Sequence, residues 1–322
     1  MLKQLSMYIG VLIGIVLLAG CNYFETGNVQ NVGMLVENTI EGHPWEEKGH
    51  RGLMSIADEY EIDVYVKENV QTAEEIDEAI GDMVHDGVNL IFGHSSNYGQ
   101  PFVEIAESYP DVHFVYFNGG YTAENVTSLN FNSHAMGFFA GMIAGEMTNT
   151  NEVGIIGAYE WQPEVEGFYE GVKYQNPMAN VHMRFVNDWR DTHTALDVYD
   201  VMKNDNVDVF YPTGDAFSAT VINHVKDDGL YAIGYVTDQS TIDDETVLTS
   251  TIQHVDHLYE IAAEKFNDGT IKGTVETFDF QDDVITLGEF SDEVPESFQE
   301  DVKEYVEQYK ETSLLPNEIE VD

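Results

Sequence analysis

Short apolar runs alternate with longer amphipathic segments in the first third of the chain. Four runs rich in β-branched and aromatic residues are expected strands: 32–36, 62–66, 90–93 and 113–117. Three segments with apolar residues at helical spacing are expected helices: 45–60, 72–85 and 102–109. Thr72, with Glu75 three residues later, is typical of a helix start, and Gly87 of a helix end. The pattern predicts a parallel sheet that helices cover on both faces.

The alternation restarts near residue 136 and continues almost to the end of the chain. Further strands are expected at 153–157, 182–186, 207–211, 231–235 and 247–251, with a β-rich stretch over 275–287. Further helices are expected at 136–147, 165–174, 193–203, 217–226, 255–266 and 298–309. Glycine and alanine recur along 136–147, which predicts close helix packing. The fold class is therefore α/β, with two doubly wound parallel-sheet lobes and a ligand cleft between them.

The first twenty residues have the pattern of a secretory signal peptide. Lys3 supplies the positive start, and an apolar run over 7–20 is too short to span a bilayer comfortably. Small residues then precede Cys21, the single cysteine of the chain. No internal disulfide is therefore possible, and packing alone must hold the core.

The sequence Leu17-Leu18-Ala19-Gly20-Cys21 resembles the lipobox of bacterial lipoproteins, whose cysteine is lipidated and becomes the new N-terminus. The resemblance implies a signal peptide over 1–20, a tether over 21–30 and a palmitate-type anchor on Cys21. The body would then lie on the extracytoplasmic face of the cell membrane. An ordinary export signal with a chance cysteine is the alternative.

The net charge of the chain limits which kinds of molecule it can bind. The chain carries 59 acidic and 13 basic residues, a formal net charge of −46 at pH 7. The acids are spread along the whole body, which suits a solvated, halophilic surface in high salt, where screening weakens their repulsion. A polyvalent cation sink would need acids clustered at ligand spacing, and none are apparent. Direct nucleic-acid binding is excluded because no basic patch is present to neutralise phosphates.

Polar and aromatic residues follow the carboxyl ends of the expected strands, where ligands bind in such sheets. Their mixture of rings, amides, hydroxyls and carboxylates suits a small polar or aromatic solute. The candidate ligand-binding residues are Asn38, Trp45, His94, Asn118, Trp161, Gly214, Asp215, Asp238 and Gln239. Trp45 and Trp161 are expected to stack on the solute, and the polar side chains to form hydrogen bonds with it.

Each candidate has a structural alternative. Trp45 and Trp161 suit packing at the domain edges equally well, and Asp215 and Asp238 suit helix caps. His94 beside two serines lacks the Gly-x-Ser-x-Gly elbow of a hydrolase. His254 and His257 lack a companion at metal spacing, and no Gly-rich phosphate loop follows the first strand. The sequence predicts no cofactor, no metal and no enzymatic activity.

An ordered set of segments resembles the basic membrane protein family, lipoprotein receptors with the type I periplasmic-binding fold. The segments are 32–35, 45–53, 87–93, 109–114, 135–141, 167–174, 231–234 and 238–239. The best-known members capture purine nucleosides for an ABC importer, so the resemblance implies such a solute and transporter as partners. It implies a first lobe of 31–130 plus about 254–278, a second of 131–253 plus about 279–312, and an acidic tail over 313–322.

Two features set this chain apart within the family. The segments 160–165 and 234–240 are similar to the Med branch, membrane-attached competence regulators. The positions that contact the nucleoside in the family also differ in this chain. Where the family has an Asn-Asp pair in its first loop, this chain has Glu41-Gly42, and where the family has an acid that binds ribose, it has Val236. Gln253 replaces a lysine of the family, and Glu164 replaces an aromatic residue. The first expectation is therefore a solute-binding protein of an ABC importer. The alternative is a Med-like regulator that acts indirectly on competence transcription.

Overall fold

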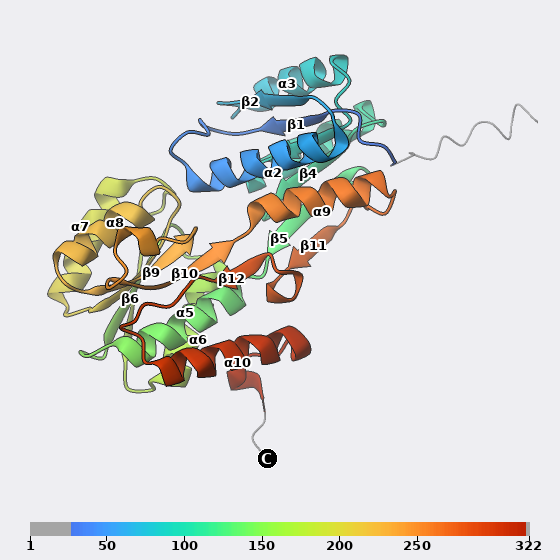
Figure 1. The fold of residues 1–322 in the computed structure, drawn as a ribbon. Helices are drawn as coiled ribbons and strands as arrows, with labels where there is room; N and C mark the ends of the chain where they lie inside the picture. The colour runs from blue at the N-terminus through green and yellow to red at the C-terminus, as the bar shows by residue number, and fades with distance from the viewer. Residues whose placement is uncertain (1–26, 320–322) are drawn as a thin grey trace, which may run out of the picture.

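The computed structural model describes residues 27–319, which fold into two α/β lobes (Figure 1). Each lobe is built on a sheet of six strands. The predicted signal peptide, Cys21 and most of the predicted tether lie outside the described residues. Within 27–319, no helix is long and apolar enough to cross a membrane.

The first sheet has the strand order β11-β5-β4-β3-β1-β2, and all its pairings are parallel. Its strands are β1 (Val32–Leu35), β2 (Val64–Lys67), β3 (Leu90–Gly93), β4 (His113–Phe117), β5 (Val126–Phe131) and β11 (Val275–Phe278). Every residue of β1, β3 and β4 is buried. This burial is the physical reason for their continuous apolar sequence, because helices cover both faces of the sheet.

Four helices cover the first sheet. They are α2 (Pro44–Tyr60), α3 (Ala73–His85), α4 (Gly99–Ile105) and α9 (Val255–Asn267). Thr72 and Glu75 form the reciprocal capping box that starts α3, as predicted. The helices α2 and α9 lie side by side although about 200 residues separate them in sequence (Figure 1). Gly52 permits this approach, because a Cβ there would lie 2.8 Å from the backbone of Asp256.

The second sheet has the order β12-β10-β9-β8-β6-β7. Its strands are β6 (Glu152–Gly157), β7 (Asn180–Phe185), β8 (Val209–Thr213), β9 (Tyr231–Val236), β10 (Val247–Gln253) and β12 (Ile285–Leu287). All neighbours are parallel except β12, which runs antiparallel to β10 at the edge. The predicted parallel sheet is therefore confirmed with one antiparallel edge strand.

Five helices belong to the second lobe. They are α5 (Ser133–Met147), α6 (Pro163–Gln175), α7 (Thr192–Asn204), α8 (Ser218–Asp227) and α10 (Glu296–Thr312). Glycines bring α5 and α6 into backbone contact: a Cβ on Gly141 would lie 2.2 Å from the carbonyl oxygen of Phe168, and one on Gly171 would lie 1.9 Å from that of Phe138. The close packing predicted from the glycine and alanine spacing is confirmed.

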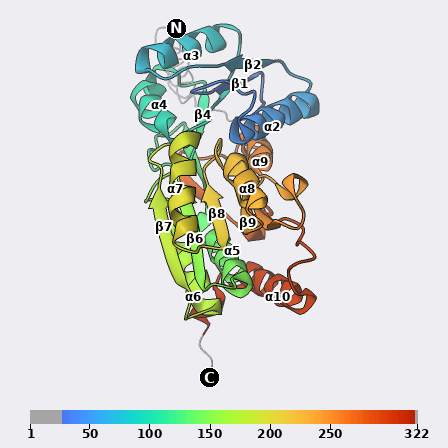
Figure 2. The same ribbon diagram turned by 90° about the vertical axis from the view of Figure 1, so that its left-hand side faces the viewer.

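The chain passes between the two sheets three times, after β5, β10 and β11. Figure 2 shows the resulting stack, with the first lobe above the second. The buried carboxylate of Asp279, at the third passage, accepts hydrogen bonds from Asn132 Nδ2 at 2.6 Å and Tyr309 Oη at 2.5 Å. The first and third passages are thus tied to α10.

The expected β-rich stretch over 275–287 forms two strands, β11 and β12, in different sheets, and two further elements differ from the prediction. The strand β5 was not expected, because its sequence Val-Thr-Ser-Leu-Asn-Phe is half polar. Thr127 and Ser128 are nevertheless fully buried, and their hydroxyls find partners in His113, Lys272 and Gly119. The helix expected at 102–109 begins earlier, at Gly99, and becomes a 3-10 turn after Ile105.

Candidate functional site

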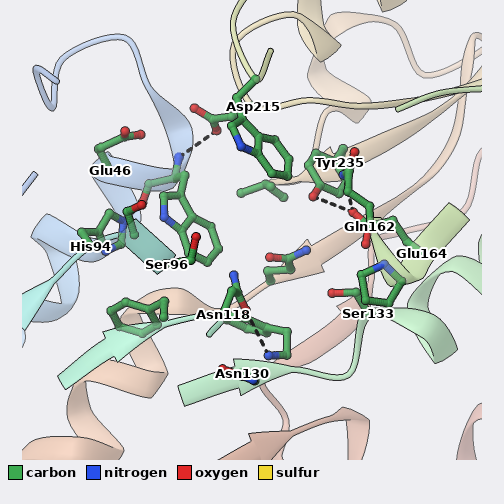
Figure 3. A pocket seen from close by; sticks show the side chains of 18 of the residues that line it. Glu46, His94, Ser96, Asn118, Asn130, Ser133, Gln162, Glu164, Asp215 and Tyr235 are labelled. Atoms are coloured by element: carbon green, nitrogen blue, oxygen red, sulfur yellow. Dashed lines mark hydrogen bonds between the residues drawn. The ribbon is translucent and has the colours of Figure 1, made fainter. Parts of the chain in front are cut away.

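A cavity of about 350 Å³ lies between the lobes, at the carboxyl ends of the strands. Figure 3 shows Glu46 and His94 of the first lobe on one side of the cavity, and Gln162, Glu164 and Tyr235 of the second lobe on the other. The lining residues are Glu37, Asn38, Trp45, Glu46, His94, Ser95, Ser96, Phe117, Asn118, Asn130, Phe131, Ser133, Trp161, Gln162, Pro163, Glu164, Trp189, Arg190, Asp215, Tyr235, Val236 and Gln253. Its size is suited to a small organic solute.

Aromatic rings form two groups on the cavity wall. In the first lobe, Trp45 stacks on His94 with ring centres 5.2 Å apart and meets Phe117 and Phe131 edge-on. In the second lobe, Trp161 stacks on Tyr159 at 5.3 Å and meets Trp189 edge-on. The chain has three tryptophans, and all three line the cavity. A solute held here would contact rings from both lobes.

Two carboxyl groups of the cavity are strongly desolvated. Burial, reinforced by the nearby Asp215, raises the pKa of Glu46 to about 8. Burial likewise raises the pKa of Asp215 to about 6. The Oε2 atom of Glu46 is buried and has no hydrogen-bond partner within the described structure. An ionised Glu46 would therefore have one buried oxygen without a hydrogen-bond donor.

A third carboxyl group, Glu164, is fully buried but satisfied. Its Oε1 accepts hydrogen bonds from Gln162 Nε2 at 2.7 Å and from Tyr235 Oη at 2.9 Å. Burial raises the pKa of Glu164 above its ordinary value. Beside it, Val236 has a left-handed backbone (φ +66°), which is unusual for a β-branched residue and marks the sharp end of β9.

Hydrogen bonds join the lobes around the cavity. The backbone N–H of Trp45 donates to Asp215 Oδ1 at 3.0 Å, and Arg190 donates to Asn38 Oδ1. The ammonium of Lys48, on α2, donates to the carbonyl oxygen of Gln253 at 2.7 Å, at the end of β10. Burial lowers the pKa of Lys48 to about 8. These contacts join the two lobes beside the cavity.

Six of the nine candidate residues line the cavity: Asn38, Trp45, His94, Asn118, Trp161 and Asp215. They come from both lobes, as the strand-end argument predicts. His94 has no free nitrogen for a solute, because Nε2 donates to the Trp45 carbonyl oxygen at 2.8 Å and Nδ1 accepts from Tyr259 Oη at 2.9 Å. Its place in the structure is therefore behind the Trp45 ring, as a support.

The structure does not place Gly214, Asp238 or Gln239 on the cavity wall. The chain turns sharply after β9, so Gln239 folds back: its Oε1 accepts from the Tyr235 backbone N–H, and its Nε2 donates to Ser218 Oγ. Asp238 is exposed and accepts from the backbone of Ser240, which starts a 3-10 turn. Gly214 is buried against the Phe217 ring. Of the candidates between residues 214 and 239, only Asp215 lines the cavity.

The sequence prediction missed several lining residues, including Glu46, Trp189, Arg190 and Tyr235. Trp189 and Arg190 follow the carboxyl end of β7, so the strand-end argument could have found them had it been applied to that strand. Glu46 lies beside the predicted Trp45, where helix periodicity alone gave no reason to single it out. Tyr235 lies inside a strand and is read from the sequence as core.

The catalytic and metal alternatives find no support among the described residues. Both nitrogens of His94 are occupied, so it is not available as a base for Ser95 or Ser96. His254 accepts or donates at Thr286 Oγ1, and His257 contacts Glu260. Residues 27–319 contain no group of three or more side chains placed to hold a metal ion.

Three of the four positions singled out by the resemblance lie on the cavity wall: Glu164, Val236 and Gln253. The fourth, Glu41-Gly42, is exposed and does not line the cavity. The wall thus carries a carboxyl group, an isopropyl group and an amide where the resemblance implies an aromatic ring, an acid and an ammonium.

Comparison with known proteins agrees with this architecture. The chain is 46% identical over 317 residues to the transcriptional activator protein med of Bacillus subtilis, covering 98% of this chain and 99% of that protein. It is 27% identical over 244 residues to a purine-binding protein of Brucella abortus, covering 75% and 68%. The crystal structure of a transcriptional activator of the comK gene from Bacillus halodurans superimposes with a TM-score of 0.84 at 43% identity, covering 88% of this chain and 99% of that one.

The two lobes, their parallel sheets and the cavity between them are those of the type I periplasmic-binding fold, as predicted. The family model described as "ABC transporter substrate-binding protein PnrA-like" matches residues 29–322. The chain therefore belongs to this Bmp family of substrate-binding proteins.

Proposed function

We propose that this protein captures a small solute between its lobes and presents it to an ABC importer. The observation that supports the proposal is the cavity between the lobes, on whose wall aromatic rings and hydrogen-bonding groups converge from both lobes. Opening would admit the solute, and closure would bury it and create a surface that a transporter recognises. Binding is thus the signal, and no chemical step is proposed.

A flat, polar solute suits the aromatic lining. Trp45 offers a ring backed by His94, and Trp161 offers one backed by Tyr159. The purine-binding relative from Brucella abortus supports a nucleobase-sized ligand. The altered positions Glu164, Val236 and Gln253 favour a solute other than an ordinary nucleoside.

Attachment to the membrane belongs to the same proposal. The lipobox-like sequence before Cys21 supports cleavage and lipidation at that residue, which would hold the body at the extracytoplasmic surface. Labelling with a palmitate analogue, with Cys21→Ser as the control, tests this step. A Cys21→Ser protein that stays in the membrane fraction and keeps its label would contradict it.

Ligand binding is tested on the purified full-length protein in molar salt. Because all three tryptophans line the cavity, their fluorescence reports occupancy directly. A ligand at a hundredfold excess over its dissociation constant stabilises the protein by roughly 2.7 kcal/mol, a clear shift in melting temperature. A panel of nucleosides, nucleobases and small amines that changes neither signal would refute the receptor function.

A second candidate function is that of a Med-like regulator. The specific observation in its favour is the 46% identity to the med protein over nearly the whole of both chains. Expressing this chain in a Bacillus subtilis strain that lacks med, with a comK reporter, tests the idea. Restored reporter activity, retained in a variant whose cavity is blocked, would favour regulation without a transported solute.

A further inference from the structure

We infer that the solute is an organic cation, a quaternary or aromatic nitrogen compound, and that the carboxylate of Glu46 is its counter-ion. The inference deepens the proposed receptor function and rests on it, because it concerns the same cavity. It follows from the charge of the wall, from one unpartnered oxygen and from the aromatic rings.

Acidic side chains outnumber basic ones on the cavity wall. Four carboxyl groups line it: Glu37, Glu46, Glu164 and Asp215. Arg190 is the one lysine or arginine side chain among the lining residues, and its guanidinium already donates to Asn38. His94 adds no charge, because burial lowers its pKa to about 4. A cationic solute is attracted to such a wall, and an anionic one is repelled.

Glu46 is the carboxyl group of the wall to which a solute would supply a missing interaction partner. Glu164 has two donors, and Asp215 receives the Trp45 N–H, but Oε2 of Glu46 is buried with no partner within the described structure. A buried acceptor without a donor is costly, and an ionised one more so. A positively charged group in the cavity would supply the missing partner.

The rings of the cavity fit the same ligand. Trp45, Trp161 and Trp189 all line it, and tryptophan is the aromatic side chain that attracts cations most strongly over its face. Trp45 is fixed against His94, Phe117 and Phe131, so its ring is held in place before a solute arrives. Aromatic faces are the usual recognition chemistry of quaternary nitrogen, and the Glu46 carboxylate would add a counter-charge in the same cavity.

Protonation of the Glu46 carboxyl should make the binding of a cation depend on pH. The groups that influence the Glu46 carboxyl are Glu37, Asp215, Arg190, Tyr98 and Tyr259, from five different parts of the fold. With the pKa of Glu46 at about 8, the empty site is protonated at neutral pH. A permanent cation must displace this proton, so its affinity should rise about tenfold between about pH 7 and pH 9.

The test compares solutes that differ in charge but share a shape. Choline is paired with its neutral carbon isostere dimethylbutanol, and the N-methyl pyridinium form of nicotinamide with nicotinamide. Each is titrated into the full-length protein by tryptophan fluorescence, for wild type, Glu46→Gln and Glu59→Gln. Glu59 is an exposed acid on the same helix, so its variant controls for net charge.

We expect the cationic member of at least one pair to bind about tenfold or more tightly than its neutral partner. Glu46→Gln should abolish this preference and its pH dependence, whereas Glu59→Gln should keep both. Calorimetry of the wild type in buffers of different ionisation enthalpy should show proton release on binding. This last measurement and the paired titrations need no variant, so a misfolded Glu46→Gln protein would not prevent the test.

Equal or tighter binding of the neutral members, or no binding of either cation, would overturn the inference. If adenosine, inosine or another neutral solute then binds, the receptor function stands and only the charge assignment fails. If neither the cations nor the neutral solutes bind, both the receptor function and the charge assignment would be overturned.

Discussion

The backbone N–H of Trp45 donates to Oδ1 of Asp215 at 3.0 Å, across 170 positions of sequence. Trp45 is the second residue of α2 in the first lobe, and Asp215 follows β8 in the second. The carboxylate therefore does not cap the helix after it, the alternative considered from the sequence, but reaches the other lobe. Together with the bond from Arg190 to Asn38, it makes closure depend on a few polar contacts.

Removing the Asp215 carboxylate should favour the open form. Asp215→Ala deletes an acceptor of a charge-assisted hydrogen bond, which is worth about 1.5–3 kcal/mol, so the closed-to-open ratio should fall by about tenfold or more. Asp215→Asn keeps an oxygen acceptor in the same place and serves as the control. Small-angle X-ray scattering should give a larger radius of gyration for the ligand-free Ala variant. Equal radii for all three proteins would contradict this account of closure.

The two predicted stacking tryptophans should respond differently to truncation. Trp161 is 63% exposed, so Trp161→Ala should change the free energy of unfolding by less than about 0.5 kcal/mol. Trp45 is partly buried against His94, Phe117 and Phe131, so Trp45→Ala should cost up to about 3–5 kcal/mol. Both variants should lose ligand affinity, but only Trp161→Ala does so in a fully stable protein. Urea unfolding and ligand titration of both variants check this, and unchanged affinity in the Trp161 variant would refute its stacking role.

The sequence was sufficient to predict elements whose burial is uniform. The strands β1, β3 and β4 are buried on both faces, so their apolar runs are continuous and unmistakable. The strand β5 was missed because Thr127 and Ser128 are buried through hydrogen bonds to distant residues, a partnership that no local pattern reveals. The edge strand β12 has only three residues, too few to show a period.

The site was predictable only as far as strand ends identify it. Asn38, Trp45 and Asp215 follow strands and line the cavity, as expected. Gln239 also follows a strand, but the left-handed turn at Val236 directs it back into the second lobe. Whether a strand-end residue faces the cleft depends on such backbone turns. These are not visible in the residue pattern, because valine rarely adopts a positive φ.

Glu46 should make the protein less stable as the pH rises. Its pKa in the folded protein is about 8, above its unfolded value, so its contribution is complete below about pH 4.5 and is lost as the pH rises through about 8. Glu46→Gln cannot ionise. Its free energy of unfolding relative to wild type should therefore increase between about pH 5 and pH 9, by on the order of a few kcal/mol.

Urea unfolding of both proteins at several pH values checks this expectation. Burial lowers the pKa of His94 and His113, so their contributions are lost instead as the pH falls below about 6.5. Those losses occur in both proteins and cancel in the difference. A difference that stays constant from pH 5 to pH 9 would mean that the Glu46 carboxyl is not desolvated in solution.

The contact between α5 and α6 should tolerate no side chain at Gly141. A Cβ there would lie 2.2 Å from the Phe168 carbonyl oxygen and 2.8 Å from the Val172 backbone nitrogen, so the helices must separate. The cost of such overpacking is about 1–3 kcal/mol or more, which should lower the melting temperature by at least about 2 °C. Because α6 carries Glu164 at its first turn, the same displacement should move that carboxyl group and weaken ligand binding.

Gly145→Ala is the matched control on the same helix. Its Cβ would lie 3.2 Å from its nearest neighbours, Gln175 Cβ and the Val172 carbonyl oxygen, a contact that a shift of a few tenths of an ångström relieves. Alanine also favours helix over glycine by about 1 kcal/mol, which offsets that strain. Thermal unfolding should therefore separate the two variants clearly. If Gly141→Ala and Gly145→Ala had the same melting temperature, the backbone contact between α5 and α6 would not be what stabilises the second lobe and positions Glu164.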